Sequence, residues 1–99
     1  MSRTLGGFPT VQTVELTADL WTEVRLIGFA YKFEVSVDNG GGTVNLSRQE
    51  VGAADDPQAR EVLAGERYTE DGVTGPRDGL PLYLMSGTEG TKVTITAWK

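Results

Sequence analysis

Residues 29–47 read FAYKFEVSVDNGGGTVNLS and carry the strongest secondary-structure signal in the chain. From residue 29 to 37, large apolar residues alternate with small or polar ones, the period of two that places successive side chains on opposite faces of a β-strand. Val44 and Leu46 repeat this alternation after the glycines, so residues 38–42 are predicted to connect two strands. We expect one apolar set to face the core: Phe29, Tyr31, Phe33, Val35 and Val37.

Residues 38–42 (Asp-Asn-Gly-Gly-Gly) admit three interpretations. A glycine-bearing loop of this length is a common hairpin link, because glycine reaches positive φ without a Cβ clash. Calcium binds oxygen ligands in such turns, but neither this loop nor the other candidate, Glu70-Asp71, has the acidic spacing of a calcium loop. A phosphate loop would have to precede a helix. We therefore predict a turn, whereas a melting temperature lowered by a chelator would indicate calcium.

The first half of the chain holds two further strand segments. Residues 11–16 (VQTVEL) alternate, with Val14 and Leu16 on one side, and residues 21–26 (WTEVRL) resume the strand pattern after a turn at residues 17–19. The pair predicts a hairpin, or one strand that bends across a bulge.

The second half begins with a polar loop at residues 48–57. Asp56-Pro57 has the composition of a helix start, but we favour an extended segment that carries Val62 and Leu63 into the core. Residues 80–85 (LPLYLM) read as a buried strand with Pro81 at its start, where a missing amide costs little. Residues 92–98 form a closing strand that turns three side chains inward: Val93, Ile95 and Ala97.

These segments predict an all-β, single-domain β-sandwich or jelly-roll of about seven to eight short, mostly antiparallel strands. Ninety-nine residues provide one core and no second domain. We assign residues 11–99 to the sandwich and residues 1–10, which lack a sustained pattern, to an extended N-terminal arm.

The composition excludes several kinds of chemistry. With neither Cys nor His, the chain has no disulfide, no thiolate and no imidazole base, so Ser-His-Asp and Cys-His catalysis are excluded. The acidic residues fall in loops, where solvated surface is their usual role, although a glycosidase-like pair would also use two carboxylates. We predict no enzyme activity, no catalytic residue, no cofactor and no metal ligand.

Charge and hydropathy restrict the partners. A net charge of −5 with scattered Lys and Arg argues against nucleic-acid binding, and no apolar run of membrane-spanning length occurs. The N-terminus lacks the apolar segment of a signal peptide, so we expect a soluble protein made in the cytoplasm. Trp21 and Trp98 either pack against the sheets or stack on sugar rings, as exposed aromatics do in carbohydrate-binding sandwiches.

Four stretches together resemble a family of small tailed-bacteriophage virion proteins. They are VELTADLWTEV (residues 14–24), DNGGGTVNL (38–46), the turn at residues 63–66, where Ala64 replaces a proline, and LPLYLMSGTEGTKVTITAWK (80–99). The resemblance implies a capsid decoration protein that binds the head exterior, commonly as a trimer, and is located in the virion. Its partners would be the major capsid protein or other virion proteins.

The N-terminal arm holds the residues that we expect to contact such a partner: Arg3, Leu5 and Phe8. An arm without its own core gains burial only against another surface. The alternatives are a carbohydrate-binding or adsorption module and a tail or head-tail joining component.

Overall fold

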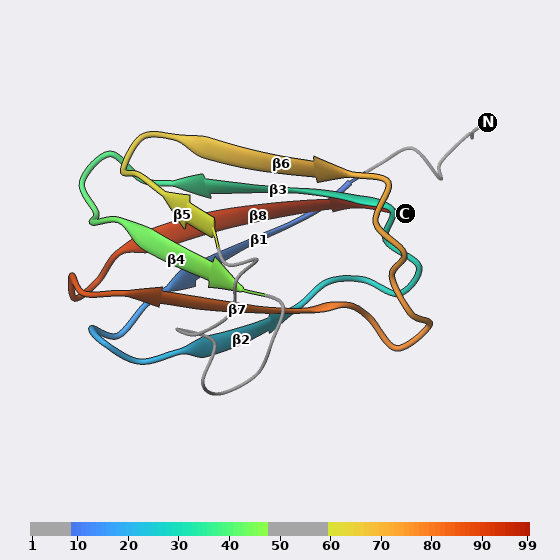
Figure 1. Ribbon diagram of the computed structural model, residues 1–99, viewed down its shortest axis with the longest axis horizontal. Helices are drawn as coiled ribbons and strands as arrows, with labels where there is room; N and C mark the ends of the chain where they lie inside the picture. Colours follow the sequence, from blue (N-terminus) through green and yellow to red (C-terminus); the bar gives the residue numbers. More distant parts are fainter. Residues whose placement is uncertain (1–8, 48–59) are drawn as a thin grey trace.

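The computed structural model describes residues 9–47 and 60–99, which form eight β-strands in two four-stranded sheets (Figure 1). The first sheet has the order β1 (Thr10–Glu15), β8 (Lys92–Trp98), β3 (Lys32–Val37) and β6 (Arg67–Asp71). The second has the order β2 (Thr22–Arg25), β7 (Pro81–Ser86), β4 (Val44–Ser47) and β5 (Arg60–Val62). All neighbouring strands are antiparallel.

The chain crosses between the sheets at nearly every connection. Only β4 and β5 are consecutive strands within one sheet, and the order β1-β8-β3-β6 over β2-β7-β4-β5 is that of a jelly roll. The predicted fold class is therefore confirmed. The two predicted hairpins are wrong, because β1 and β3 both pair with the distant β8, while β2 and β4 both pair with β7. Period-two alternation shows which face of a strand is buried but not which strand lies beside it.

The core lies between the two sheets and contains the inward-facing apolar side chains. The predicted inward residues of β3 and β8 are confirmed, since none is more than 2% exposed: Phe33, Val35, Val37, Val93, Ile95 and Ala97. Side chains of the second sheet pack against them: Val24, Val44, Leu46, Val62, Leu82 and Leu84. Each buried Val, Leu, Ile or Phe contributes about 1.5–3 kcal/mol to stability.

The segment around β5 and β6 corrects one prediction and adds a strand that was not predicted. Val62 is buried as expected, but Leu63 is 47% exposed because the chain turns immediately after it, with Glu66 N–H donating to Leu63 O and Gly65 at a φ of 82°. Strand β6 was not predicted from the sequence, because its five residues (RYTED) include only one large apolar side chain, Tyr68, and so show no apolar alternation. The helix start considered at Asp56-Pro57 lies outside the described residues.

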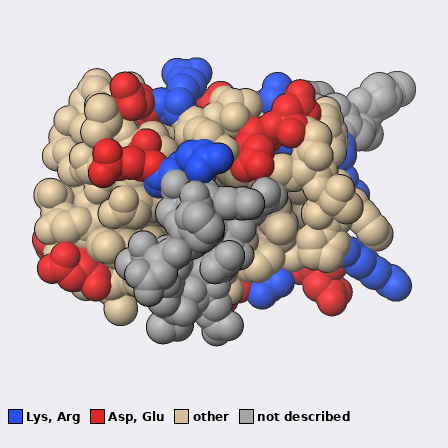
Figure 2. All heavy atoms as spheres, in the orientation of Figure 1, with Lys and Arg blue, Asp and Glu red and all other residues tan. Residues whose placement is uncertain are grey.

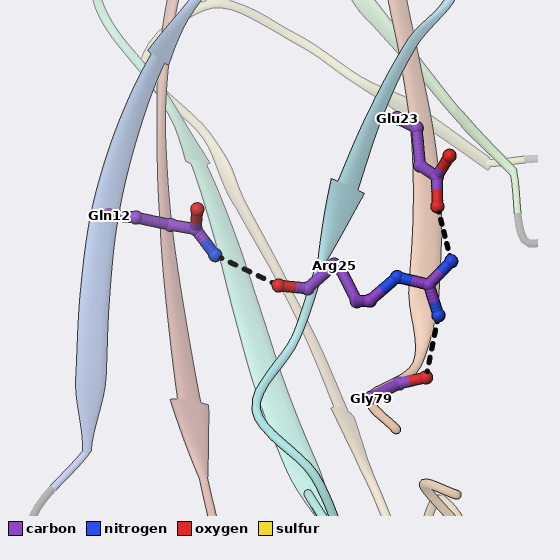
Figure 3. A network of polar contacts seen from close by, with 4 residues as sticks. All are labelled: Gln12, Glu23, Arg25 and Gly79. Atoms are coloured by element: carbon purple, nitrogen blue, oxygen red, sulfur yellow. Dashed lines mark hydrogen bonds and ion pairs between the residues drawn. The ribbon is translucent and has the colours of Figure 1, made fainter.

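Polar contacts join the sheets along the side where β1 and β2 are edge strands (Figure 3). Gln12 Nε2 donates to the carbonyl oxygen of Arg25 at 3.4 Å, linking β1 to β2. The guanidinium of Arg25 contacts Glu23 at 2.7 Å and donates to the carbonyl oxygen of Gly79 at 3.3 Å. The side chains of Arg25 and Glu23 are about half exposed, so their ion pair adds at most about 1 kcal/mol to stability. The bond from Arg25 to Gly79 holds the end of the β6–β7 loop against β2.

Candidate protein-docking site

One end of the sandwich gathers the β2–β3 loop (residues 26–31), the β6–β7 loop (residues 72–80) and the end of β8 (Figure 1). We call this end the tip. Both loops cross from one sheet to the other. Strand β1 also begins here, since Thr10 lies opposite Ala97. The tip is therefore the end of the sandwich at which β1 begins and the predicted N-terminal arm precedes it.

Backbone hydrogen bonds tie the two loops of the tip together along their lengths. They run from Leu26 N to Leu80 O (2.8 Å), Phe29 N to Pro76 O (3.1 Å), Gly75 N to Ala30 O (3.0 Å) and Val73 N to Tyr31 O (2.9 Å). Loops at a sandwich end usually bond to water, so four bonds between two loops mark a tip with a fixed backbone.

Glycines permit this close approach. A Cβ at Gly28 would collide with the carbonyl oxygen of Arg77, and one at Gly75 with the backbone of Ala30. Gly79 has a φ of 100°, and a Cβ there would collide with the carbonyl oxygen of Leu26. Three glycines therefore have a direct steric role in holding the loops in contact.

Phe29 is the unusual residue of the tip. Its φ is 61° and its side chain is 58% exposed. A left-handed conformation costs an L-residue about 1–2 kcal/mol, and this side chain recovers little of that by burial. Bulky residues at positive φ are outliers in folded proteins, and such strain clusters at functional sites. The chain thus holds a large apolar group in water on a rigid support.

Tyr31, two residues along, is also exposed, at 48%. Its amide donates to the carbonyl oxygen of Trp98, which places it at the same end of the first sheet. The prediction that Phe29 and Tyr31 belong to the core is therefore wrong. Strand β3 begins only at Lys32, and Ala30 is the buried residue of the preceding turn, 1% exposed. The sequence signal for this break is Gly28, directly before the aromatic run.

The two tryptophans are both partly buried. Trp98 follows the inward-facing Ala97 and so lies on the outer side of the first sheet, with Lys32 Nζ 4.8 Å from the centroid of its ring. This cation–π contact occupies one face of the indole that a sugar would use. Trp98 therefore lies against the outer face of the first sheet and is not part of the core cluster.

The loop at residues 38–42 lies at the opposite end of the sandwich. None of its three glycines has a positive φ, so the predicted reason for them is wrong. Instead, a Cβ at Gly41 or Gly42 would collide with the side chain of Thr91 or Thr88, respectively. The loop packs closely against the β7–β8 turn, which accounts for Gly41 and Gly42 without a ligand.

A buried hydroxyl network holds this packing in place. Thr91 is 0% exposed, and its hydroxyl donates to the carbonyl oxygen of Thr88 at 2.8 Å while accepting from the amide of Gly42 at 3.1 Å. Ser86 Oγ lies 3.2 Å from the same hydroxyl and accepts from the amide of Thr88. The network satisfies the polar groups at this end.

The two carboxylates of the second calcium candidate, Glu70 and Asp71, have bonding partners within the chain. Asp71 accepts from the amide of Gly72 at 2.7 Å, and Glu70 accepts from the hydroxyl of Tyr68 at 3.2 Å. Across residues 9–47 and 60–99, no three His, Cys, Asp or Glu side chains lie close enough together to hold a metal ion.

On the face shown in Figure 2, basic side chains are interspersed with acidic ones.

The predicted contact residues Arg3, Leu5 and Phe8 lie outside the described residues. The structure places their point of attachment, at Thr10, beside the tip that carries Phe29 and Tyr31. The sequence predicted contact residues in the arm, which stay a prediction, but it did not reveal that Phe29 and Tyr31 are exposed.

Comparison with known proteins supports the fold alone. No family model matches the chain, and no curated protein matches it. A de novo designed double-stranded β-helix, solved in solution by NMR, aligns with a TM-score of 0.52 and 15% sequence identity over 90% of this chain and 95% of that chain. At such low identity the likeness concerns architecture, and it agrees with the strand order. The described residues contain no helix able to span a membrane.

Proposed function

We propose that this chain is a capsid decoration protein of a tailed bacteriophage, which binds the exterior of the head through its tip and stabilises the shell without catalysis. The observation that carries the docking role is Phe29, an exposed aromatic side chain held at positive φ on a hydrogen-bonded loop pair. Aromatic residues, Phe and Tyr among them, are enriched in the buried cores of protein interfaces. The sequence resemblance supports the phage assignment, and the jelly roll is a fold that viral capsid proteins use.

Two attachment elements at one end give the proposal a mechanism. The tip supplies Phe29 and Tyr31, and the arm, which joins the sandwich at the same end, supplies Arg3, Leu5 and Phe8. If the two elements contact neighbouring capsid subunits, each copy bridges them and resists their separation. Two linked contacts of modest strength give a high combined affinity, because the second forms at high effective concentration.

The test is co-sedimentation with phage heads purified without this chain. We expect the double variant Phe29→Ala/Tyr31→Ala to lose at least about tenfold in affinity, equal to about 1.4 kcal/mol, and deletion of residues 1–8 to abolish binding. Leu63→Ala is the matched control, because Leu63 is a 47% exposed apolar residue at the opposite end. Head binding by the double variant equal to that of the unmodified chain would contradict the proposal.

The rival function is carbohydrate binding in an adsorption module, favoured by the same exposed aromatic pair. A glycan stacked at the tip would lie near Trp98 and change its fluorescence, whereas a decoration protein would not respond to sugars. Cryo-EM of particles with and without the chain separates decoration of the head from a tail or head-tail joining position.

A further inference from the structure

Strand β6 forms one edge of the first sheet. It pairs with β3 on one side only, and Figure 1 shows it as the outermost strand of that sheet. Three of its five residues are exposed, Arg67, Thr69 and Asp71, and the two between them are half-buried. An open edge of this length presents backbone donors and acceptors that another strand can use.

The register shows which backbone groups face outward. Val37 N–H donates to Glu66 O, so this position is a hydrogen-bonded pair of the β3–β6 ladder. Hydrogen-bonded and non-hydrogen-bonded pairs alternate along an antiparallel ladder. Residues 68 and 70 therefore bond to β3, whereas residues 67, 69 and 71 direct their N–H and C=O groups to the open side.

We propose that the β6 edge pairs with the β6 edge of a second copy of this chain, antiparallel and with a two-fold axis beside Thr69. Charge complementarity selects this occupant. In this register Arg67 of each copy lies opposite Asp71 of the other, Tyr68 lies opposite Glu70, and Thr69 lies opposite itself. The groups at residues 67, 69 and 71 then form six backbone hydrogen bonds between the copies.

The neighbouring two-fold registers all place like charges directly opposite one another. An axis beside Tyr68 brings Glu66 opposite Glu70, and an axis beside Glu70 brings that carboxylate opposite its own copy. An axis beside Arg67 places Arg67 opposite its own copy, and an axis beside Asp71 places Asp71 opposite its own copy. Like charges directly opposite are destabilising in a sheet, so the sequence of β6 specifies one register.

Both charged side chains are exposed, and the Asp71 carboxylate, which accepts one bond from the amide of Gly72, has further acceptor sites for an arginine. The side chain of Arg67 is 70% exposed, and its ion pair with Glu34 is long, at 3.8 Å. Figure 2 shows basic and acidic side chains together along the upper edge of the molecule, where Figure 1 places β6. The β1 edge lacks this complementarity, because pairing about Thr13 would place Val11 opposite Glu15.

The proposed contact produces a closed dimer and not an open chain of copies. A self-complementary edge related by a two-fold axis joins two copies and leaves no free β6 edge for a third. The product is a dimer with one continuous eight-stranded sheet, which differs from the trimer that the phage-protein resemblance implies. The proposal concerns the isolated chain and does not depend on the capsid.

The test is sedimentation equilibrium of the purified chain and its charge-reversed variants. We expect a monomer–dimer equilibrium that Arg67→Asp or Asp71→Arg weakens by about tenfold or more, because each change creates two like-charge pairs across the axis. The double variant Arg67→Asp/Asp71→Arg should restore the affinity. Thermal melts check that each variant is folded.

A second pair of variants separates backbone pairing from charge. Thr69→Pro removes an outward amide at the centre of the contact and should abolish the dimer, because proline is tolerated at an edge but has no N–H to donate. Thr13→Pro is the matched control at the outward position of β1 and should leave the dimer unchanged. A monomer or a trimer at every concentration would overturn the proposal, as would a dimer that neither Thr69→Pro nor the single charge reversals weaken.

Discussion

The amide of Phe29 donates a hydrogen bond to the carbonyl oxygen of Pro76 at 3.1 Å, across two loops that connect the sheets in opposite directions. This bond holds the backbone of Phe29 in the left-handed region while its side chain remains in solvent. Stability and the proposed docking role therefore place opposite demands on this position, because glycine would fit the backbone better but would contribute no contact surface.

Replacing Phe29 should separate the two demands. Phe29→Gly relieves about 1–2 kcal/mol of conformational strain, which stabilises the fold. It also destabilises the fold by about 0.5–1 kcal/mol, because glycine gives the unfolded chain more backbone freedom. We therefore expect a melting temperature equal to or above that of the unmodified chain. Phe29→Ala keeps the strain and serves as the comparison. Differential scanning calorimetry of both variants is the measurement. A decrease of more than about 2 kcal/mol in the free energy of unfolding of Phe29→Gly would mean that the Phe29 ring packs in the folded protein, which would contradict its role as an exposed docking residue.

Phe33 provides the contrast within the same aromatic run. It is 0% exposed and packs on Tyr68, with ring centroids 6.3 Å apart. Phe33→Ala should reduce the free energy of unfolding by about 3–5 kcal/mol, as measured by urea denaturation. A loss smaller than 1 kcal/mol, similar to that expected for the exposed Tyr31→Ala, would contradict the placement of β3.

Period-two alternation predicted β3 and β8 and their buried faces, because Phe33, Val35, Val93 and Ile95 each cover one side of a sheet. It did not predict the start of β3, because Phe29 and Tyr31 continue the same alternation through a turn. The alternation also did not predict which strands pair. The partner of β1 lies at the other end of the chain, and burial of both sheets against one core, not loop length, determines that pairing.

The candidate site depended on the same long-range contacts. Gly28 marks a break in the alternation, but it does not show that Phe29 is exposed, because the backbone of Phe29 bonds to Pro76 and that of Gly28 lies against the carbonyl oxygen of Arg77. Those residues are about fifty positions away in the sequence. Leu5 and Phe8 could be predicted as contact residues, because an apolar residue that belongs to no strand pattern is visible in the sequence itself.

The Thr91 hydroxyl is expected to stabilise the end opposite the tip. Thr91→Val keeps the shape of the side chain but leaves the Gly42 amide and the Thr88 carbonyl oxygen without this partner. We expect a loss of about 1–3 kcal/mol, because these partly buried groups lose a hydrogen-bond partner that water replaces only in part. Thr94→Val, on the outer side of β8, should change stability by less than about 0.5 kcal/mol. Equal melting temperatures for the two variants would refute the role of the network.

The glycines at residues 40–42 allow the packing account to be tested within one loop. A Cβ at Gly42 would meet the side chain of Thr88, whereas at Gly40 the nearest atom is Asp38 Oδ2 at 3.9 Å. Neither glycine has a positive φ, so alanine is compatible with the backbone at both positions. Gly42→Ala should therefore cost about 1–3 kcal/mol through overpacking, while Gly40→Ala should be neutral or slightly stabilising, because alanine restricts the unfolded chain. Chemical denaturation of both variants decides between the two explanations. Similar losses in both would indicate that backbone freedom, not contact with the β7–β8 turn, is what this loop requires.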